Sequence, residues 1–205
     1  MKLVYQDIPT DAGTADVVVL HREGVFRIDQ AVTVARASGA ARRVVGAFGD
    51  YGVLRSGMEL GGLAWYRALP GYAGTDPISL AKAVLQVTDL LDGLADSMPA
   101  PELVGWGQGA VVAAGVGSLF GGKVRSVACF DAEPGHLDAL PEPAEGSPVV
   151  PVLVGATSED PATLDRLAQR LGDRGAPVTT WAFDGTGDPG EAEALRLGPW
   201  LSGGG

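Results

Sequence analysis

The residues from Leu103 to Ala110 carry the clearest chemical pattern in the sequence. Gly105, Gly107 and Gly109 alternate there, between an apolar run and a stretch of small residues. Flanking glycines of this kind frame a nucleophile elbow, a tight strand-to-helix turn whose central serine attacks a carbonyl group. Here the central residue is Gly107, which has no side chain that could attack. Taken alone, the pattern is equally typical of an ordinary glycine-rich turn.

Carboxylates near the ends of predicted strands are the candidates for acid–base chemistry. They are Glu23, Asp50, Asp131, Glu133, Asp160 and Asp188. When several carboxylates face one partly apolar cavity, the pKa of at least one rises, as proton transfer near neutral pH requires. The alternative for each is a solvated loop charge or a helix cap. His21 is a further candidate proton donor, although a histidine at a strand end can equally order the next loop through backbone hydrogen bonds.

Aromatic residues near these positions could line a cavity for an apolar ligand. Trp65, Tyr66 and Trp106 are candidates for such a lining, and Trp106 could equally pack beneath the glycine-rich turn. Phe130, at the end of a predicted strand, is a further candidate for the pocket wall. In a protein without catalytic activity, Phe130 and Arg22 would instead fill the cleft.

Apolar runs that alternate with helical patterns must position these residues. Strands are predicted at 16–21, 43–48, 102–106, 124–130, 149–154 and 178–183, with a further edge strand around 4–5. Helices are predicted at 28–38, 76–94, 108–120, 162–171 and 191–201, whereas 53–76 and 134–148 are expected to be irregular. Strands that alternate with helices pair in parallel through right-handed crossovers. We therefore expect one doubly wound α/β domain over 1–201, with a mainly parallel sheet, helices on both faces and a flexible tail at 202–205.

Four short segments are informative through their order along the chain. Residues 19–21 read Val-Leu-His at a strand end, and 65–66 read Trp-Tyr before the long helix. The glycine frame at 103–110 follows, and then the strand segment 151–154. In this order they resemble the carboxylesterase/phospholipase family of α/β-hydrolases, which includes the acyl-protein thioesterases. The resemblance extends over nearly the whole chain and implies an α/β-hydrolase-like fold.

The resemblance also implies where a catalytic triad would lie. The family's serine falls on Gly107, its acid on Asp160 and its histidine on Asp188. Acyl transfer needs a nucleophile beside a base that can accept its proton. With a glycine and an aspartate at those two positions, the chain is not expected to be a conventional serine hydrolase.

Backbone N–H groups form the oxyanion hole of such enzymes, so an oxyanion hole can persist without the triad. Its donors would be the amide of Gln108, at the start of a predicted helix, and one near Arg22 or Glu23. Such a pocket can bind and polarise a carbonyl group without covalent chemistry. We therefore expect non-hydrolytic chemistry on a small carbonyl-containing substrate, such as cyclisation, isomerisation or dehydration in biosynthesis.

Two other functions remain open. One is a protein without catalytic activity that binds a ligand or partner and has a filled cleft. The other is a residual esterase or thioesterase whose nucleophile is Ser158 or Cys129, although Cys129 lies in an apolar strand and is expected to be a packing residue. A cavity of several hundred Å³ open to Gly107 and Asp188 would favour chemistry. Labelling by a fluorophosphonate probe would favour the residual hydrolase.

Composition excludes several other classes of function. Among the 205 residues, 25 acidic and 15 basic ones give a formal charge of −10, which disfavours nucleic acids and membrane surfaces as partners. One cysteine excludes an internal disulfide, and no zinc spacing, P-loop or dinucleotide fingerprint predicts a metal or cofactor. Short apolar runs and an N-terminus without a signal-peptide core predict a soluble, cytoplasmic protein. Residues 53–76 or the terminal helix could form a lid or a homodimer contact.

Overall fold

The computed structural model describes residues 3–8, 15–24, 31–32, 34, 41–54, 60–67, 74–157, 161–183 and 197–201. They form a seven-stranded sheet, a two-stranded sheet and the helices that pack on the large sheet. The predicted tail at 202–205 lies outside the described residues. Within the described ranges, no helix has the length and apolar character needed to span a bilayer. Nor do three His, Cys, Asp or Glu side chains of these ranges gather where they could hold a metal ion.

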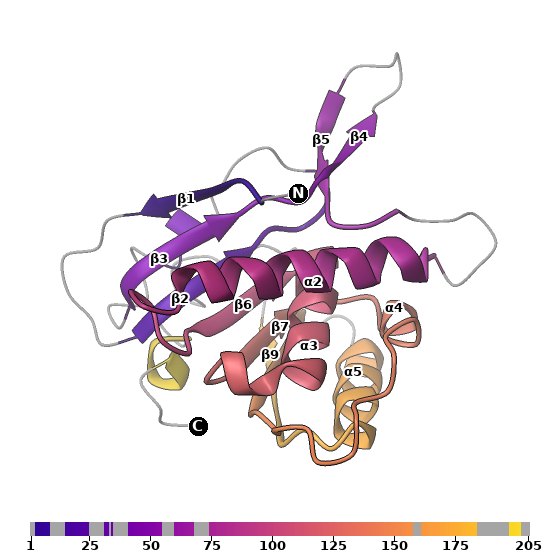
Figure 1. The fold of residues 1–205 in the computed structure, drawn as a ribbon. Coiled ribbons are helices and arrows are strands. Elements are labelled where there is room, and N and C mark those ends of the chain that lie inside the picture. The colour runs from indigo at the N-terminus through magenta and orange to yellow at the C-terminus, as the bar shows by residue number, and fades with distance from the viewer. Residues whose placement is uncertain are drawn as a thin grey trace.

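The large sheet positions the site through its strand order, β1-β3-β2-β6-β7-β8-β9 (Figure 1). Its strands are β1 (Tyr5–Ile8), β2 (Ala15–Leu20), β3 (Ala41–Ala47), β6 (Glu102–Trp106), β7 (Val127–Phe130), β8 (Val152–Thr157) and β9 (Val178–Phe183). All neighbours pair in parallel except β1, which is antiparallel to β3 at the edge. The strand order reverses between β2 and β6. In open α/β sheets, ligands bind beyond the carboxyl ends of the strands at such a switch point.

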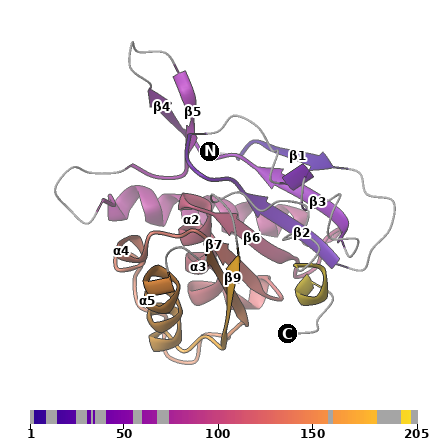
Figure 2. The ribbon, with the colours of Figure 1, turned by 180° about the vertical axis from the view of Figure 1, so that it is seen from behind.

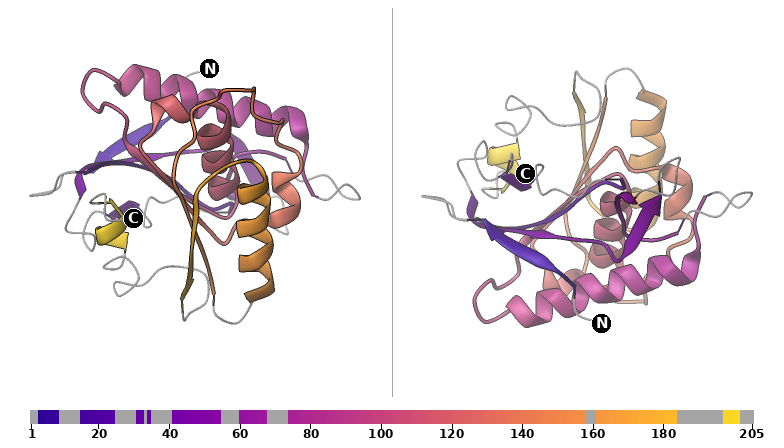
Figure 3. Two further views of the ribbon diagram at one scale, coloured as in Figure 1. Left: turned by 90° about the horizontal axis from the view of Figure 1, so that it is seen from below. Right: turned by 90° about the horizontal axis from the view of Figure 1, so that it is seen from above.

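Helices cover both faces of the large sheet (Figures 2 and 3). On one face lie α2 (Pro77–Leu94), α3 (Gln108–Leu119) and α5 (Pro161–Asp173), which share an apolar core with one set of strand residues. On the other face, helical residues 197–201, together with Ala31 and Val34, pack in a second core. Alternate residues of a strand point to opposite faces, so a sheet covered on both sides needs strands that are apolar throughout. The predicted fold class is confirmed.

Several predicted segments differ from the structure, among them the strand predicted at 124–130, which begins at Val127. β4 (Tyr51–Leu54) and β5 (Leu60–Ala64) pair in an antiparallel hairpin that projects from the large sheet (Figure 1), so residues 53–76 are not irregular throughout. A single helical turn, α4 (Pro134–Leu137), interrupts the predicted connection at 134–148, and a short 3-10 turn, η1 (Gly121–Lys123), follows α3. β8 begins at Val152 instead of residue 149 because Pro151 has no N–H to donate to the ladder. Its carbonyl instead accepts the N–H of Val127.

Candidate functional site

The turn between β6 and α3 has the backbone of a nucleophile elbow. Gly107 joins the two elements with φ 53° and ψ −121°, in the left-handed region that favours glycine. Its N–H donates to the carbonyl oxygen of Phe130 at 2.9 Å, which fixes the turn against β7. At Gly109 a Cβ atom would lie only 2.5 Å from the carbonyl oxygen of Leu20 at the end of β2. The helix therefore packs on the strands closely enough to require glycine, as the sequence pattern predicted.

The carboxylate of Glu23 occupies the space directly over this elbow. The backbone N–H of Gln108 donates to Glu23 Oε2 at 3.0 Å. This amide is at the N-terminus of α3, where free N–H groups and the helix dipole favour a negative charge. A Cβ atom on Gly107 would lie 2.6 Å from the same oxygen. Glu23 therefore occupies the space that a nucleophilic side chain at position 107 would fill. It also accepts the hydrogen bond of the Gln108 N–H, which is the predicted oxyanion donor.

The side chain of Gln108 organises the aromatic segment beside the elbow. Its Oε1 accepts hydrogen bonds from the backbone N–H groups of Trp65 at 3.0 Å and Tyr66 at 3.3 Å. The indole Nε1 of Trp65 donates to the carbonyl oxygen of His21 at 2.7 Å. Both aromatic side chains are buried. One residue of α3 thus connects the elbow to the segment after β5, and it holds Tyr66 in place.

Tyr66, a predicted pocket residue, pairs with His136, which was not among the predicted site residues. The Tyr66 hydroxyl lies 2.8 Å from His136 Nδ1, and the two rings meet edge to face. Burial, followed by the charges of Glu23 and Glu133, raises the pKa of Tyr66. Burial lowers the pKa of His136, and the same two carboxylates partly oppose that change. Both rings are therefore uncharged near neutral pH, and both lie within electrostatic reach of Glu23.

His21 orders the surrounding loops, so its predicted role as a proton donor is not supported. Its Nε2 accepts the backbone N–H of Gly49 at 3.0 Å, and its Nδ1 bonds to the carbonyl oxygen of Arg22. The ring is buried against Trp65, and this burial lowers the pKa of His21. With both ring nitrogens bound to backbone groups, His21 has no proton to exchange with a ligand. His21 instead orders the neighbouring loops through backbone hydrogen bonds, which was the other role predicted for a histidine at this strand end.

Arg22 and Asp131 connect the two loops that flank the elbow. Arg22 Nη2 lies 3.2 Å from Asp131 Oδ2, and both side chains are mostly covered. Asp131 follows β7 with φ 50°, an uncommon conformation for a residue other than glycine. The pair holds the loop after β2 beside the loop after β7. The contact therefore fixes the loop beside Glu23, which adjoins Arg22 in the chain.

Trp106 and Phe130 belong to the core of the sheet. Both are fully buried, and their rings stack with centroids 5.1 Å apart. Phe130 also contacts Trp181 and Phe183 edge to face, on the face of the sheet away from α3. Trp106 ends β6 and Phe130 ends β7. Their side chains lie on one face of the sheet, whereas the side chain of Cys129 lies on the other face. Trp106 therefore packs beneath the glycine-rich turn, which was one of its two predicted roles. Phe130 packs in the same core.

Of the remaining candidates, Asp50 and Glu133 are described, and three lie outside the described residues. Asp50 accepts hydrogen bonds from Lys82 and Gln86 on α2; burial alone would raise the pKa of Asp50, but these bonds outweigh it and lower that pKa. Glu133 is exposed at the start of α4. Asp160, Asp188 and Ser158 are outside the described ranges.

Cys129 is not placed to act as a nucleophile. The thiol is buried in the core and donates to the carbonyl oxygen of Ala110 at 3.4 Å. Burial raises the pKa of Cys129 to about 12, so the reactive thiolate is absent near neutral pH. Its expected role as a packing residue fits this environment.

Solved structures of similar fold are esterases and related proteins. Esterase PE8 aligns with a TM-score of 0.75 at 19% identity over 98% of both chains. A carboxylesterase from Mesorhizobium loti gives 0.75 at 19% identity over 98% of this chain and 95% of that one. SOBER1 from Arabidopsis thaliana gives 0.65 at 15% identity over 91% and 97%. The chain therefore has the α/β-hydrolase fold. No family model matches the sequence, and no curated protein matches it either.

Proposed function

We propose that this chain binds a small carbonyl compound at the elbow and transfers a proton on it without hydrolysis. The observation that carries the proposal is the Glu23 carboxylate on the Gln108 amide, at 3.0 Å. A substrate carbonyl oxygen would replace Glu23 as the acceptor of the Gln108 N–H. The Glu23 carboxylate would then lie beside the α-carbon of the substrate. The amide then stabilises negative charge on the oxygen while Glu23 accepts a proton from that carbon. In a β,γ-unsaturated carbonyl compound, return of the proton to the γ-carbon moves the double bond into conjugation and completes an isomerisation with no change in oxidation state. In a saturated carbonyl compound, the proton returns to the same carbon, and the step appears as hydrogen exchange.

The Tyr66–His136 pair supports this chemistry by supplying uncharged hydrogen-bonding groups near the carboxylate. When the imidazole proton is on Nε2, the Tyr66 hydroxyl donates to Nδ1 over 2.8 Å. Because neither ring is charged near neutral pH, the pair adds no repulsive or competing charge beside Glu23. General acid–base catalysis by positioned groups contributes about 100-fold or more to a rate.

Absence of hydrolytic chemistry is part of the proposal, and Gly107→Ser tests it. The variant is expected to remain unlabelled by a fluorophosphonate probe and to hydrolyse p-nitrophenyl acetate no faster than the unmodified protein. The new Cβ would lie 2.6 Å from Glu23 Oε2, and the ring of His21 is bound at both nitrogens. The resemblance also gives this hydroxyl Asp188 as its base, which accepts protons poorly near neutral pH. Rapid ester cleavage by the variant would contradict the proposal.

Proton transfer itself is measured by exchange of carbon-bound hydrogen in D₂O. Wild-type protein is incubated with 2-butanone, cyclohexanone or pyruvate, and loss of the α-proton signals is followed by proton NMR. We expect faster exchange of at least one of these ketones, and Glu23→Gln should slow it about 100-fold because the amide side chain cannot accept the proton.

Glu133→Gln is the matched control for that experiment. Glu133 is an exposed carboxylate whose charge reaches Tyr66 and His136, as that of Glu23 does. The Gln108 amide donates to Glu23 and not to Glu133, so exchange by this variant should stay within about threefold of wild type. Equal loss of activity in both variants would assign the effect to overall charge and refute the role of Glu23.

A ligand-binding protein without chemistry is the second candidate function. It is favoured by the same contact, since Glu23 already satisfies the amide that would polarise a substrate. The two candidates differ in one result. A ketone that shifts the Gln108 amide resonance without accelerated exchange supports binding alone, whereas exchange that depends on Glu23 supports proton transfer.

A further inference from the structure

A cavity of about 380 Å³ lies at the opposite edge of the sheet from the elbow. Its wall includes the start of β8, the end of α3 and the turn that follows α5, all at the amino ends of the strands. Small-molecule sites have volumes of about 300–1,000 Å³, and this cavity is at the small end of that range. A cavity of this size at the amino edge shares no residue with the elbow site.

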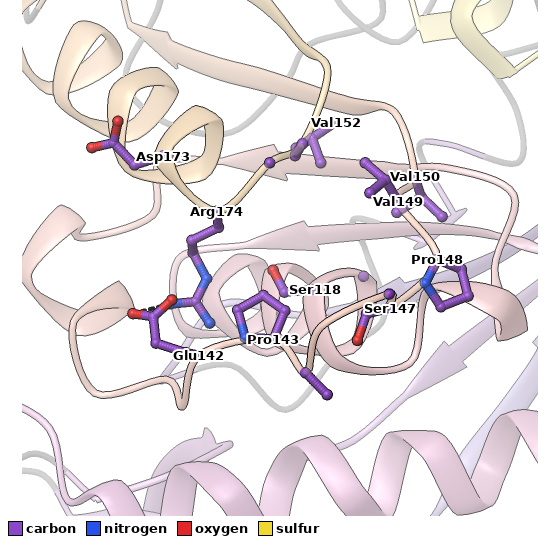
Figure 4. A pocket seen from close by; sticks show the side chains of 15 residues that line it. Ser118, Glu142, Pro143, Ser147, Pro148, Val149, Val150, Val152, Asp173 and Arg174 are labelled. Carbon is purple, nitrogen blue, oxygen red and sulfur yellow. Dashed lines mark ion pairs between the residues drawn. The ribbon is translucent and has the colours of Figure 1, made fainter.

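Arg174 is the one positively charged residue among the described residues that line the cavity (Figure 4). Only 8% of its side chain is exposed. Nη2 donates to the carbonyl oxygen of Pro141, and Nη1 lies 3.7 Å from Glu142 Oε1, beyond hydrogen-bond distance. Nε is buried and has no partner within the described residues. A guanidinium has five N–H donors, so this buried cation is far from satisfied.

Glu142 is a loosely held partner for this cation. Its side chain is 84% exposed, and Figure 4 shows it reaching Arg174 from the segment that follows α4. An exposed ion pair at that distance contributes little to stability, so a better carboxylate can replace Glu142 at little cost. Guanidinium and carboxylate groups match as forked donor and acceptor, which makes a carboxylate the preferred ligand group for Arg174.

The other lining residues define the rest of the ligand. Glu142 reaches the cavity beside Arg174, whereas the Asp173 carboxylate points outward from α5 (Figure 4). A ligand carboxylate that replaces Glu142 on Arg174 leaves the Glu142 carboxylate without its cation, and an ammonium group on the same ligand would pair with it. The apolar part of the remaining wall is formed by Pro143, Ala144, Pro148, Val149, Val150 and Val152, and the wall also includes Ser118 and Ser147.

We propose that this cavity binds an α-amino acid with an aliphatic side chain. Its carboxylate pairs with Arg174, its ammonium group with Glu142, and its side chain packs on the valines of β8 and the preceding segment. The zwitterion brings no net charge into a protein whose formal charge is −10. This site is independent of the proposed chemistry at the elbow, so either can fail without the other.

Calorimetric titration of the full chain with L-leucine tests the proposal. We expect saturable binding at millimolar concentration or below. Three analogues each lack one feature: 4-methylpentanoate the ammonium, L-leucinamide the carboxylate, and glycine the aliphatic side chain. Each should bind about tenfold more weakly or worse, as expected when a charge-assisted hydrogen bond or an apolar contact is lost. No saturable binding of leucine, or equal binding of 4-methylpentanoate, would overturn the proposal.

Variants of the lining residues locate the binding. Arg174→Gln should weaken leucine binding about tenfold or more. Glu142→Gln should weaken it by a similar factor, and because this side chain is exposed the variant keeps the fold and decides the test if Arg174→Gln does not fold. Arg166→Gln is the matched control, since Arg166 is exposed on the same helix, donates to Thr163 and does not line this cavity. Unchanged binding in Glu142→Gln, or equal weakening in Arg166→Gln, would refute the site.

Discussion

Replacing Gly109 with alanine is expected to cost about 3 kcal/mol of folding free energy and to displace the elbow. The added Cβ would lie 2.5 Å from the carbonyl oxygens of both Leu20 and His21. Backbone atoms cannot rotate away as a side chain can, so α3 must move off the end of β2. That movement carries the Gln108 amide away from Glu23. Urea unfolding measures the cost, and the Gln108 amide resonance reports the displacement.

Two other helical glycines provide matched controls for this substitution. At Gly93 in α2 and at Gly172 in α5, a Cβ atom would meet open space, with no described atom of another segment within 4 Å. Alanine favours a helix over glycine by up to about 1 kcal/mol, so Gly93→Ala and Gly172→Ala should stabilise the protein. The difference between Gly109 and these positions therefore isolates the close packing. Equal stability of all three variants would contradict the packing described for the elbow.

Regular elements with strong local signals were predicted closely. β6 and β9 have the predicted bounds, since each is rich in apolar or β-branched residues and lies between turn residues. α2 begins at Pro77, and the side chain of Asp76 accepts the N–H of Ile78 as an N-cap does. In these segments a few neighbouring residues determine the structure, so sequence alone is sufficient.

Elements that depend on distant partners were missed. β4 and β5 contain Gly52, Gly61 and Gly62, which weaken the alternation that marks a strand, and they are stabilised by pairing with each other. The hairpin also joins the turn after β2, where the N–H of Gly24 donates to the carbonyl oxygen of Leu63 at 2.8 Å. A contact between segments so far apart in the chain leaves no local pattern to detect.

In the candidate site, too, features set by neighbouring residues were predicted and contacts between distant residues were not. Alternating glycines predicted the elbow because its tight turn and close packing are properties of a few consecutive residues. Glu23 was one of six carboxylates, and its contact with Gln108 joins residues 85 positions apart. Tyr66 and His136 are 70 positions apart, so their pairing could not be predicted. The available signal was that His136 is one of two histidines and follows a strand that ends at the carboxyl edge.

Replacing Glu102 with glutamine is expected to stabilise the protein by roughly 3 kcal/mol at pH 8 and by almost nothing at pH 4. Glu102 begins β6 with its side chain 2% exposed, close to Ser126, and 3.7 Å from Arg125. Burial raises the pKa of Glu102 from 4.5 to about 7, although the charge of Arg125 partly opposes it. Below pH 4.5 the carboxyl is protonated in both folded and unfolded chains, so it imposes no penalty. Between pH 4.5 and 7 the carboxyl ionises in the unfolded chain but stays protonated in the fold, so stability is lost across this window, and the loss levels off above pH 7, where the folded carboxyl ionises too.

Denaturant unfolding of wild type and Glu102→Gln between pH 4 and pH 8 measures this difference. The wild-type free energy of unfolding should fall across that range relative to the variant, since glutamine does not ionise. Glu145→Gln, at an exposed position, is the control and should leave the difference between the two pH values unchanged. Because Glu102 lies at the amino end of β6, the substitution is expected to leave the elbow and its exchange chemistry unaltered. A constant difference between wild type and Glu102→Gln at all pH values would mean that the carboxyl ionises at the same pH in both states, and burial would then not control its charge.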